Sequence, residues 1–262
     1  MTPEISQALQ ASVLVGVVVR PLIVAVLLVG FWMGLGRAGR RGARRVFPWT
    51  TFAVIVIAWV STVWTLSARG AFVSVANAGV PAAGTHILLP IIGIAVGGLI
   101  LLMRSDTMAG VVDAVPLWWL VAFQSYRITG FIFLRLWSNH FLPGYFALPA
   151  GIGDTLTGVF AIGVAIALQR ETPSARKLAY AVNIFGLADL ITAVSMGMLT
   201  AAKSPAGMSP MLVYPLSIVP TFGVPLAVII HCLSLWQLNR RNRRPAGEIR
   251  VHHDHSVGQA HA

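Results

Sequence analysis

The 262-residue sequence has few charged residues and almost no cysteine. Only 10% of its residues are Asp, Glu, Lys or Arg, whereas soluble globular proteins carry about 25%. This shortage excludes an ordinary soluble domain, a disordered chain and a coiled coil. Cys232 is the only cysteine, so no disulfide can form within the chain. The only lysines, Lys177 and Lys203, lie outside the apolar runs, which excludes a rhodopsin-like retinal Schiff base.

The sequence is rich in apolar residues, at 56%, and carries a formal net charge of +11. A strongly basic chain often binds nucleic acid. Here, however, the Lys and Arg residues lie in short gaps between long apolar runs. We therefore expect an integral membrane protein whose partners are membrane lipid and a small-molecule or ion ligand, with no nucleic-acid partner. We expect no cofactor and no metal site, and the oligomeric state is left open.

Seven apolar stretches are long enough to cross the ~30 Å core of a bilayer as helices. They cover residues 10–35, 49–67, 86–103, 115–136, 145–168, 178–201 and 211–237. We predict an all-α, polytopic membrane bundle of about seven transmembrane helices. Residues 1–238 form its single membrane domain, and residues 239–262 form a basic, His-containing, disordered tail. Residues 68–85 are left open between a loop and a re-entrant hairpin.

The distribution of Lys and Arg predicts the orientation of the chain. With the amino terminus outside, 14 basic residues face the cytoplasm, and Arg69 and Lys203 face the outside. Arg20, Arg127 and Arg135 lie within spans and complete the total of 19. Because positive residues accumulate on the cytoplasmic side, we predict an outer amino terminus and a cytoplasmic carboxyl terminus, in a bacterial-type plasma (inner) membrane.

Four charged residues lie well inside predicted spans, namely Arg20, Arg127, Asp154 and Asp189. An ionised side chain at the centre of a bilayer costs ~2.5 to 3.5 kcal/mol on insertion scales. The four fall at similar depths, and two are positive and two negative. We therefore expect them to neutralise one another across four helices. The candidate substrate- or ion-binding residues of the whole chain are Arg20, Gln124, Arg127, Asp154, Asn183, Asp189, Thr221 and His231.

The last predicted span contains three prolines, Pro215, Pro220 and Pro225. Each proline removes a backbone donor and frees a carbonyl group. The helix is therefore expected to kink or break near the middle of the bilayer, where irregular backbone must be buried or line a cavity. The freed carbonyls and Thr221 either coordinate a cation or substrate or belong to a packed structural kink. For His231, the alternatives are a hydrogen bond between helices and proton handling.

Two similar heptapeptides occupy residues 151–157 and 186–192, which lie 35 residues apart on consecutive spans. Both follow the pattern Gly, apolar, small, Asp, any, apolar, Thr, and they would run antiparallel, as inverted repeats in transporters do. Residues 151–154 read Gly-Ile-Gly-Asp, which resembles the GxGD motif of intramembrane aspartyl proteases of the presenilin and prepilin-peptidase class. The resemblance implies that Asp154 shares a proton with a second Asp, for which Asp189 is the candidate. In that class the other Asp precedes the motif, whereas Asp189 follows it.

Three functions follow from these features. The leading hypothesis is a small permease or ligand-binding membrane protein with a buried Arg/Asp site. The second is a non-catalytic accessory, sensor or assembly protein in which the charges are structural. The third is an intramembrane enzyme, an aspartyl-type hydrolase acting on peptide or lipid, so enzymatic activity is left open.

Overall fold

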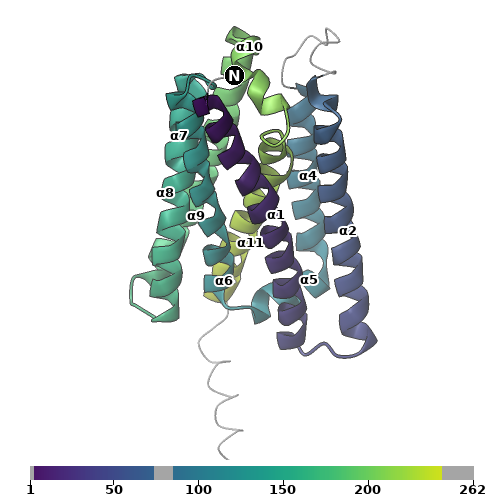
Figure 1. Ribbon diagram of the computed structural model, residues 1–262. Helices are drawn as coiled ribbons and strands as arrows, with labels where there is room; N and C mark the ends of the chain where they lie inside the picture. Colours follow the sequence, from purple (N-terminus) through teal and green to yellow (C-terminus); the bar gives the residue numbers. More distant parts are fainter. Residues whose placement is uncertain (1–2, 74–84, 244–262) are drawn as a thin grey trace, which may run out of the picture.

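A computed structural model describes residues 3–73 and 85–243 of the chain, and every regular element in these residues is a helix (Figure 1). Most of the chain lies in α-helices: α1 (Pro3–Arg37), α2 (Ala43–Ala68), α4 (Thr85–Arg104), α5 (Asp106–Ala114), α6 (Leu117–Phe123), α7 (Phe131–Ser138), α8 (Gly144–Gln169), α9 (Ala175–Lys203), α10 (Pro205–Met208) and α11 (Val224–Arg243). The described residues also contain two 3-10 helices, which are wound more tightly than an α-helix, and one π-helix, which is wound more widely. They are η1 (Gln124–Gly130), η2 (Ser209–Leu212) and η3 (Val219–Gly223), of which η3 is the π-helix. Residues 74–84 of the open segment and residues 244–262 of the predicted tail lie outside the described residues.

Six helical stretches in the described residues are long and apolar enough to cross a bilayer. They are Val18–Arg37, Ala43–Ala68, Leu117–Ser138, Gly144–Gln169, Ala175–Lys203 and Val219–Arg240. A seventh is formed if Ile91–Arg104 and Asp106–Ala114 count as one bent span. This confirms the prediction of an all-α membrane bundle with about seven spans. The orientation of the termini stays a prediction from the Lys and Arg count.

The third predicted span, residues 86–103, corresponds to the single helix α4, and the chain turns by 85° just beyond it, where α4 ends and α5 begins. Ser105 at this point has an extended backbone, and its hydroxyl accepts a hydrogen bond from the Met108 amide at 3.3 Å. Ser105 therefore caps the start of α5, and Asp106 in the first turn suits the positive end of the helix dipole. The result is a short helix that lies across the end of the bundle instead of continuing the span (Figure 1).

The fourth predicted span is interrupted in its middle by the 3-10 turn η1, between α6 and α7. Two glycines let this turn press against α8. A Cβ atom added at Gly158 would lie 2.5 Å from the backbone nitrogen of Ile128, and one added at Gly130 would meet the side chain of Asp154. The close backbone contact makes η1 a fixed part of the α8 surface and points its side chains into the bundle.

The last predicted span is broken, as the proline pattern predicts. Residues 213–217 form turns rather than a helix, η3 is a single wide turn, and α11 then continues to Arg243. The helix therefore extends beyond residue 238, where we predicted the tail to begin. The Val224 amide bonds to the Val219 carbonyl, five residues back, which is the spacing of a π-turn.

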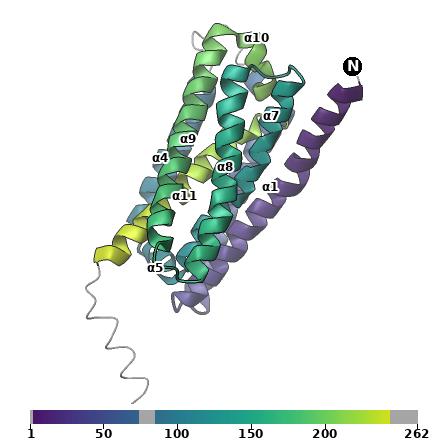
Figure 2. The same ribbon diagram turned by 90° about the vertical axis from the view of Figure 1, so that its left-hand side faces the viewer.

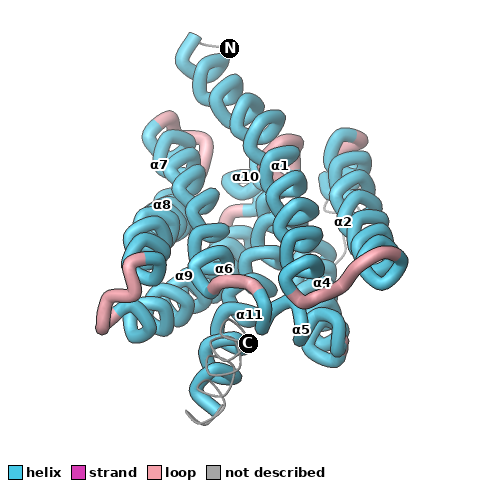
Figure 3. Tube along the Cα trace, turned by 90° about the horizontal axis from the view of Figure 1, so that it is seen from below, coloured by secondary structure: helices cyan, strands magenta, loops and turns pink. Residues whose placement is uncertain are grey.

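The broken last span lies at the centre of the bundle, with 56% of its residues buried, against 17–33% in the other five long spans. Four apolar clusters include its residues: one near α7 and α10, one between α6, α8 and α9, one against α1 and α2, and one against α4 and α5. The view along the bundle places α2 at one side and α8 at the other (Figure 3). The amino-terminal half of α1 leaves the bundle at an angle (Figure 2).

The outer faces of the long helices carry large apolar side chains. Leu22 on α1, Val54 on α2, Val159 on α8 and Ile191 on α9 are all exposed. In water such a surface would cause aggregation, whereas in a bilayer it faces lipid. This pattern fits the membrane location that the composition predicts.

Candidate functional site

The guanidinium of Arg127 is the centre of a buried polar network. Arg127 lies on η1, and its side chain is only 2% exposed. Its Nε donates to Oδ1 of Asp154 at 2.7 Å, and its Nη2 lies 2.7 Å from the same oxygen. Nη2 also donates to Oδ2 of Asp189 in a very short contact. One arginine therefore joins two carboxylates that come from two different helices, α8 and α9.

The remaining donors of Arg127 point to the centre of the bundle. Nη1 donates to the backbone carbonyl of Gly186 at 3.1 Å and contacts Nε2 of His231, also at 3.1 Å. A guanidinium has five N–H donors and no acceptor. Together with the contacts to Asp154 and Asp189, every nitrogen of the guanidinium has a partner.

The network continues through His231 to a second pair of helices. Because a guanidinium only donates, Nε2 of His231 must accept, which leaves the proton on Nδ1. Nδ1 then donates to Oδ1 of Asn183 at 2.9 Å, and Nδ2 of Asn183 donates to the Ser234 hydroxyl at 2.9 Å and to the Ala179 carbonyl at 2.7 Å. His231 thus fills the interhelical hydrogen-bonding role, one of its two predicted roles, between α9 and α11.

Glycines provide the space that the charged side chains occupy. An added Cβ at Gly186 would meet the His231 ring and lie 3.0 Å from Nη1 of Arg127, and one at Gly153 would meet the Asp189 carboxylate. Small residues allow helices in membranes to approach closely. At these positions they allow the polar groups of neighbouring helices to meet.

The three charged groups are buried to different extents. The side chains of Arg127 and Asp189 are 2% and 6% exposed, whereas that of Asp154 is 18% exposed. With both carboxylates ionised, the formal charge of the group is −1. Among the described residues, Oδ2 of Asp154 and Oδ1 of Asp189 have no hydrogen-bond donor. These two oxygens are therefore the acceptors left for a proton or a small cation.

Arg20, which we expected to neutralise an aspartate, lies elsewhere. Its Nη2 donates to the Pro215 carbonyl at 2.5 Å, and it forms no ion pair with the described residues. The reason is the tertiary packing, because α1 packs chiefly against α2 and α5 and not against α8 or α9. The structure therefore brings three of the four expected charges together, Arg127, Asp154 and Asp189, and leaves Arg20 apart.

Gln124 and Thr221 are buried but do not bond to the three charges. Nε2 of Gln124 donates to the Ala227 carbonyl at 3.2 Å, one turn before His231 on α11, and its Oε1 is buried without a partner among the described residues. The Thr221 hydroxyl donates to the Ser217 carbonyl at 2.7 Å within the broken segment. Gln124 therefore adjoins the network, and Thr221 belongs to the break.

The carbonyls freed by the broken helix accept hydrogen bonds from side chains of other helices. Pro225 has no amide to bond the Thr221 carbonyl, four residues back, and Nε1 of Trp59 donates to that carbonyl at 3.3 Å. The Tyr126 hydroxyl donates to the Gly223 carbonyl at 3.1 Å. Of the two alternatives for these groups, this geometry favours the packed structural kink over coordination of a cation.

The two heptapeptides meet at Arg127. Helices α8 and α9 follow one another through a short turn and run antiparallel, so Asp154 of the first copy and Asp189 of the second both reach the guanidinium. An aspartyl protease requires two carboxylates that share a proton directly. In this structure each carboxylate is bound to the guanidinium of Arg127, which is unlike that arrangement.

Several contacts around the site carry no sequence signal that we recognised. The Gly186 carbonyl and the Ser234 hydroxyl complete the network. Sequence reasoning missed both, because every residue has a backbone carbonyl and because a serine in a helix can have many roles. Arg240 forms an ion pair with Asp113 at 2.7 Å near the end of α11. Within the described residues no three His, Cys, Asp or Glu side chains are grouped to hold a metal ion.

The fold and this network define a polytopic α-helical membrane protein with an Arg/Asp cluster between its central helices. The family described as a domain of unknown function, DUF8737, matches residues 85–239, which is more than half of the chain, and the protein belongs to that family. The match includes every residue of the network and leaves out α1 and α2. No curated protein and no solved structure matches the chain.

Proposed function

We propose that the protein is a small permease or ligand-binding protein of a bacterial-type inner membrane, and that Arg127, Asp154 and Asp189 form its ion-coupled site. The observation that carries the proposal is the charge of this group. The single guanidinium of Arg127 pairs with two carboxylates, so one negative charge is left over. A net charge inside a bilayer is costly. A proton or small cation bound at the open carboxylate oxygens would remove that cost.

The irregular helices beside the site support the same proposal. Arg127 lies on a 3-10 turn in the middle of one span, and His231 follows the break of another. Discontinuous helices near the middle of the bilayer are typical of substrate and ion sites in transporters. Asp154 is the most exposed member of the group, so we assign to it the uptake of the proton or cation.

The proposed orientation, with the amino terminus outside, rests on the 14 basic residues in the predicted cytoplasmic loops. In this orientation the carboxyl-terminal end of α11 lies at the inner surface. The substrate class stays open, because the charged site alone does not specify an organic ligand.

The experiment uses the purified full-length chain in two stages. Its melting temperature is followed by tryptophan fluorescence with a panel of amino acids, organic cations, organic anions and sugars, because a ligand of the folded state raises that temperature. Any compound that does so is then tested as a labelled substrate in proteoliposomes that contain a pH-sensitive dye. We expect uptake that changes the internal pH and that Asp154→Asn and Asp189→Asn abolish. Unchanged uptake in both variants would contradict the proposal.

Asp113→Asn is the matched control for these two variants. Asp113 is also a partly buried carboxylate with an arginine partner, but it lies on α5, apart from the network, and pairs with Arg240 near the end of α11. Its substitution removes the same charge without touching Arg127. We expect uptake by this variant to match the wild type.

A second candidate function, a non-catalytic accessory or assembly protein, is favoured by one observation. Every nitrogen of the Arg127 guanidinium has a partner inside the protein, as in a purely structural cluster. In that case no compound of the panel raises the melting temperature, and each single substitution in the cluster lowers it. Because the substitutions are expected to destabilise the protein in either case, the response to the compound panel is the measurement that separates the two functions.

A further inference from the structure

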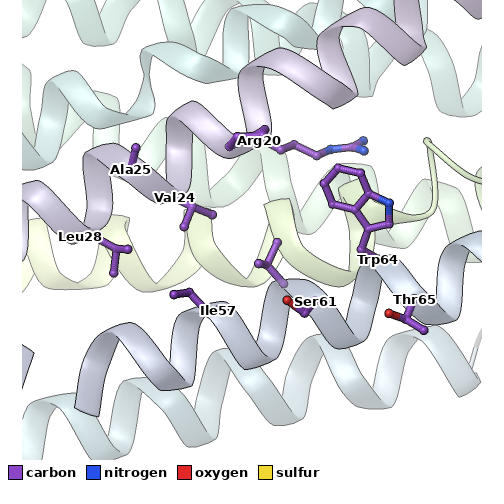
Figure 4. Close-up of a pocket in the computed structure, with 10 residues that line it drawn as sticks. Arg20, Val24, Ala25, Leu28, Ile57, Ser61, Trp64 and Thr65 are labelled. Atoms are coloured by element: carbon purple, nitrogen blue, oxygen red, sulfur yellow. The ribbon is translucent and has the colours of Figure 1, made fainter. Parts of the chain in front are cut away.

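A cavity of about 530 Å³ lies between α1 and α2, away from the Arg127 network (Figure 4). Its walls include Arg20, Val24 and Leu28 from α1, and Ile57, Val60 and Trp64 from α2. Arg20 and Trp64 lie at one end, and Leu28 and Ile57 lie toward the other (Figure 4). The cavity is thus an apolar groove with a cationic group at one end.

The position of the groove along α1 relates it to the bilayer. Arg20 precedes Arg37, at the end of α1, by 17 residues, which is about 25 Å at the helical rise of ~1.5 Å per residue. A bilayer core is ~30 Å thick, so Arg20 lies near the interface opposite to Arg37. The stacked rings of Trp64 and Tyr214, 5.9 Å apart, lie beside it. Aromatic rings of this kind are enriched at membrane interfaces.

The apolar part of the groove points from that interface toward the middle of the membrane. Leu28 follows Arg20 by eight residues, which corresponds to about 12 Å along the helix. The neighbouring outward-facing residues Leu22, Val26 and Ile55 are exposed and apolar. The groove therefore lies on a surface that faces lipid, and its long axis follows the direction of an acyl chain.

No acidic side chain among the described residues compensates the charge of the groove. The guanidinium of Arg20 donates once, to the Pro215 carbonyl, and its buried Nη1 has no hydrogen-bond partner among the described residues. No carboxylate of the described residues forms an ion pair with Arg20. A partly buried cation without a counter-ion is costly, and a phosphate group is a strong acceptor for a guanidinium.

We propose that this groove binds an anionic phospholipid of the leaflet opposite to Arg37. The phosphate accepts a hydrogen bond from the guanidinium of Arg20, and one acyl chain lies along Val24, Leu28 and Val60. Net negative charge distinguishes this lipid from a zwitterionic one, whose ammonium group would repel Arg20. The proposal does not depend on the function of the Arg127 network.

The test is native mass spectrometry of the full-length protein with phosphatidylglycerol or phosphatidylcholine of identical acyl chains. We expect the protein to retain phosphatidylglycerol about fivefold better, which is the factor for one cationic residue acting on an anionic lipid. Arg20→Gln removes this preference. Arg135→Gln removes an exposed arginine of α7 and is the matched control that keeps it.

A second pair of variants tests the groove without changing charge. Ala25 is exposed and lines the cavity, whereas Ala58 is exposed on α2 and does not. Ala25→Trp fills the space of the acyl chain and lowers retention of phosphatidylglycerol, and Ala58→Trp leaves retention unchanged. Equal retention of both lipids by the wild type would overturn the proposal. So would an unchanged preference in Arg20→Gln, unchanged retention in Ala25→Trp, or equally strong binding of inorganic phosphate alone.

Discussion

Replacement of Arg127 by glutamine is the sharpest test of the network, because it removes the one group that joins the two aspartates. Five contacts are lost, to two carboxylates, the Gly186 carbonyl and the His231 ring. Hydrogen bonds between membrane helices contribute ~0.6 kcal/mol each on average, which gives about 3 kcal/mol in total. Breaking a buried ion pair costs ~3 to 5 kcal/mol by an independent route. We therefore expect the free energy of unfolding to fall by about 3 kcal/mol.

The assay is equilibrium unfolding of the protein in mixed micelles, followed by tryptophan fluorescence and circular dichroism. Arg135→Gln is the control, since it makes the same change at an exposed position on α7. The triple variant that adds Asp154→Asn and Asp189→Asn to Arg127→Gln removes the two unpaired charges as well. We expect it to recover part of the loss, because it removes the unpaired charges but does not restore the lost contacts.

Two results would refute this reasoning. One is an Arg127→Gln variant whose free energy of unfolding lies within ~0.5 kcal/mol of the wild type, the range of an ordinary surface substitution. The other is a triple variant that is no more stable than Arg127→Gln alone. Either result would mean that the two carboxylates do not depend on the guanidinium for their place between the helices.

Other predictions concern the packing and the topology. Gly186→Ala should lower the free energy of unfolding by about 1 to 3 kcal/mol through overpacking against the polar network. Gly163→Ala, where an added Cβ meets nothing within 4 Å, should be neutral or raise it by up to ~1 kcal/mol in the same unfolding assay. Trp59→Phe removes a donor to the broken helix and should cost about 0.6 kcal/mol; no change would show that this bond does not support the break. In a cysteine-free background, Lys203→Cys should react with a membrane-impermeant maleimide added to intact cells, and Arg41→Cys only after permeabilisation. The reverse labelling would invert the predicted orientation.

The span pattern was predictable because the bilayer imposes a length and a polarity on every crossing segment. The same constraint makes Arg127, Asp154 and Asp189 conspicuous, since a charge in an apolar run has few harmless explanations. The proline spacing likewise predicted the break in the last span. These inferences use only local properties of the chain.

The expected role of Arg20 shows where such reasoning fails. Its charge was read correctly, but the position of a residue along a span does not state which helix faces which. Only the packing of α1 against α2 and α5 separates Arg20 from the carboxylates and places it in a groove of its own. The short helix α5 was missed for another reason, since residues 104–114 lay in the gap between two predicted spans and its cap, Ser105, is a single residue.

The sequence alone determined the all-α membrane class, the approximate spans and the residues that are costly to bury. The tertiary structure decided that two aspartates from antiparallel helices share one arginine and that His231 and Asn183 extend this network. It also decided that side chains of other helices donate hydrogen bonds to the carbonyls of the broken helix. The physical reason is the range of the interactions. Hydropathy acts on each segment by itself, whereas ion pairs and hydrogen bonds in a bundle depend on how helices far apart in the sequence face one another.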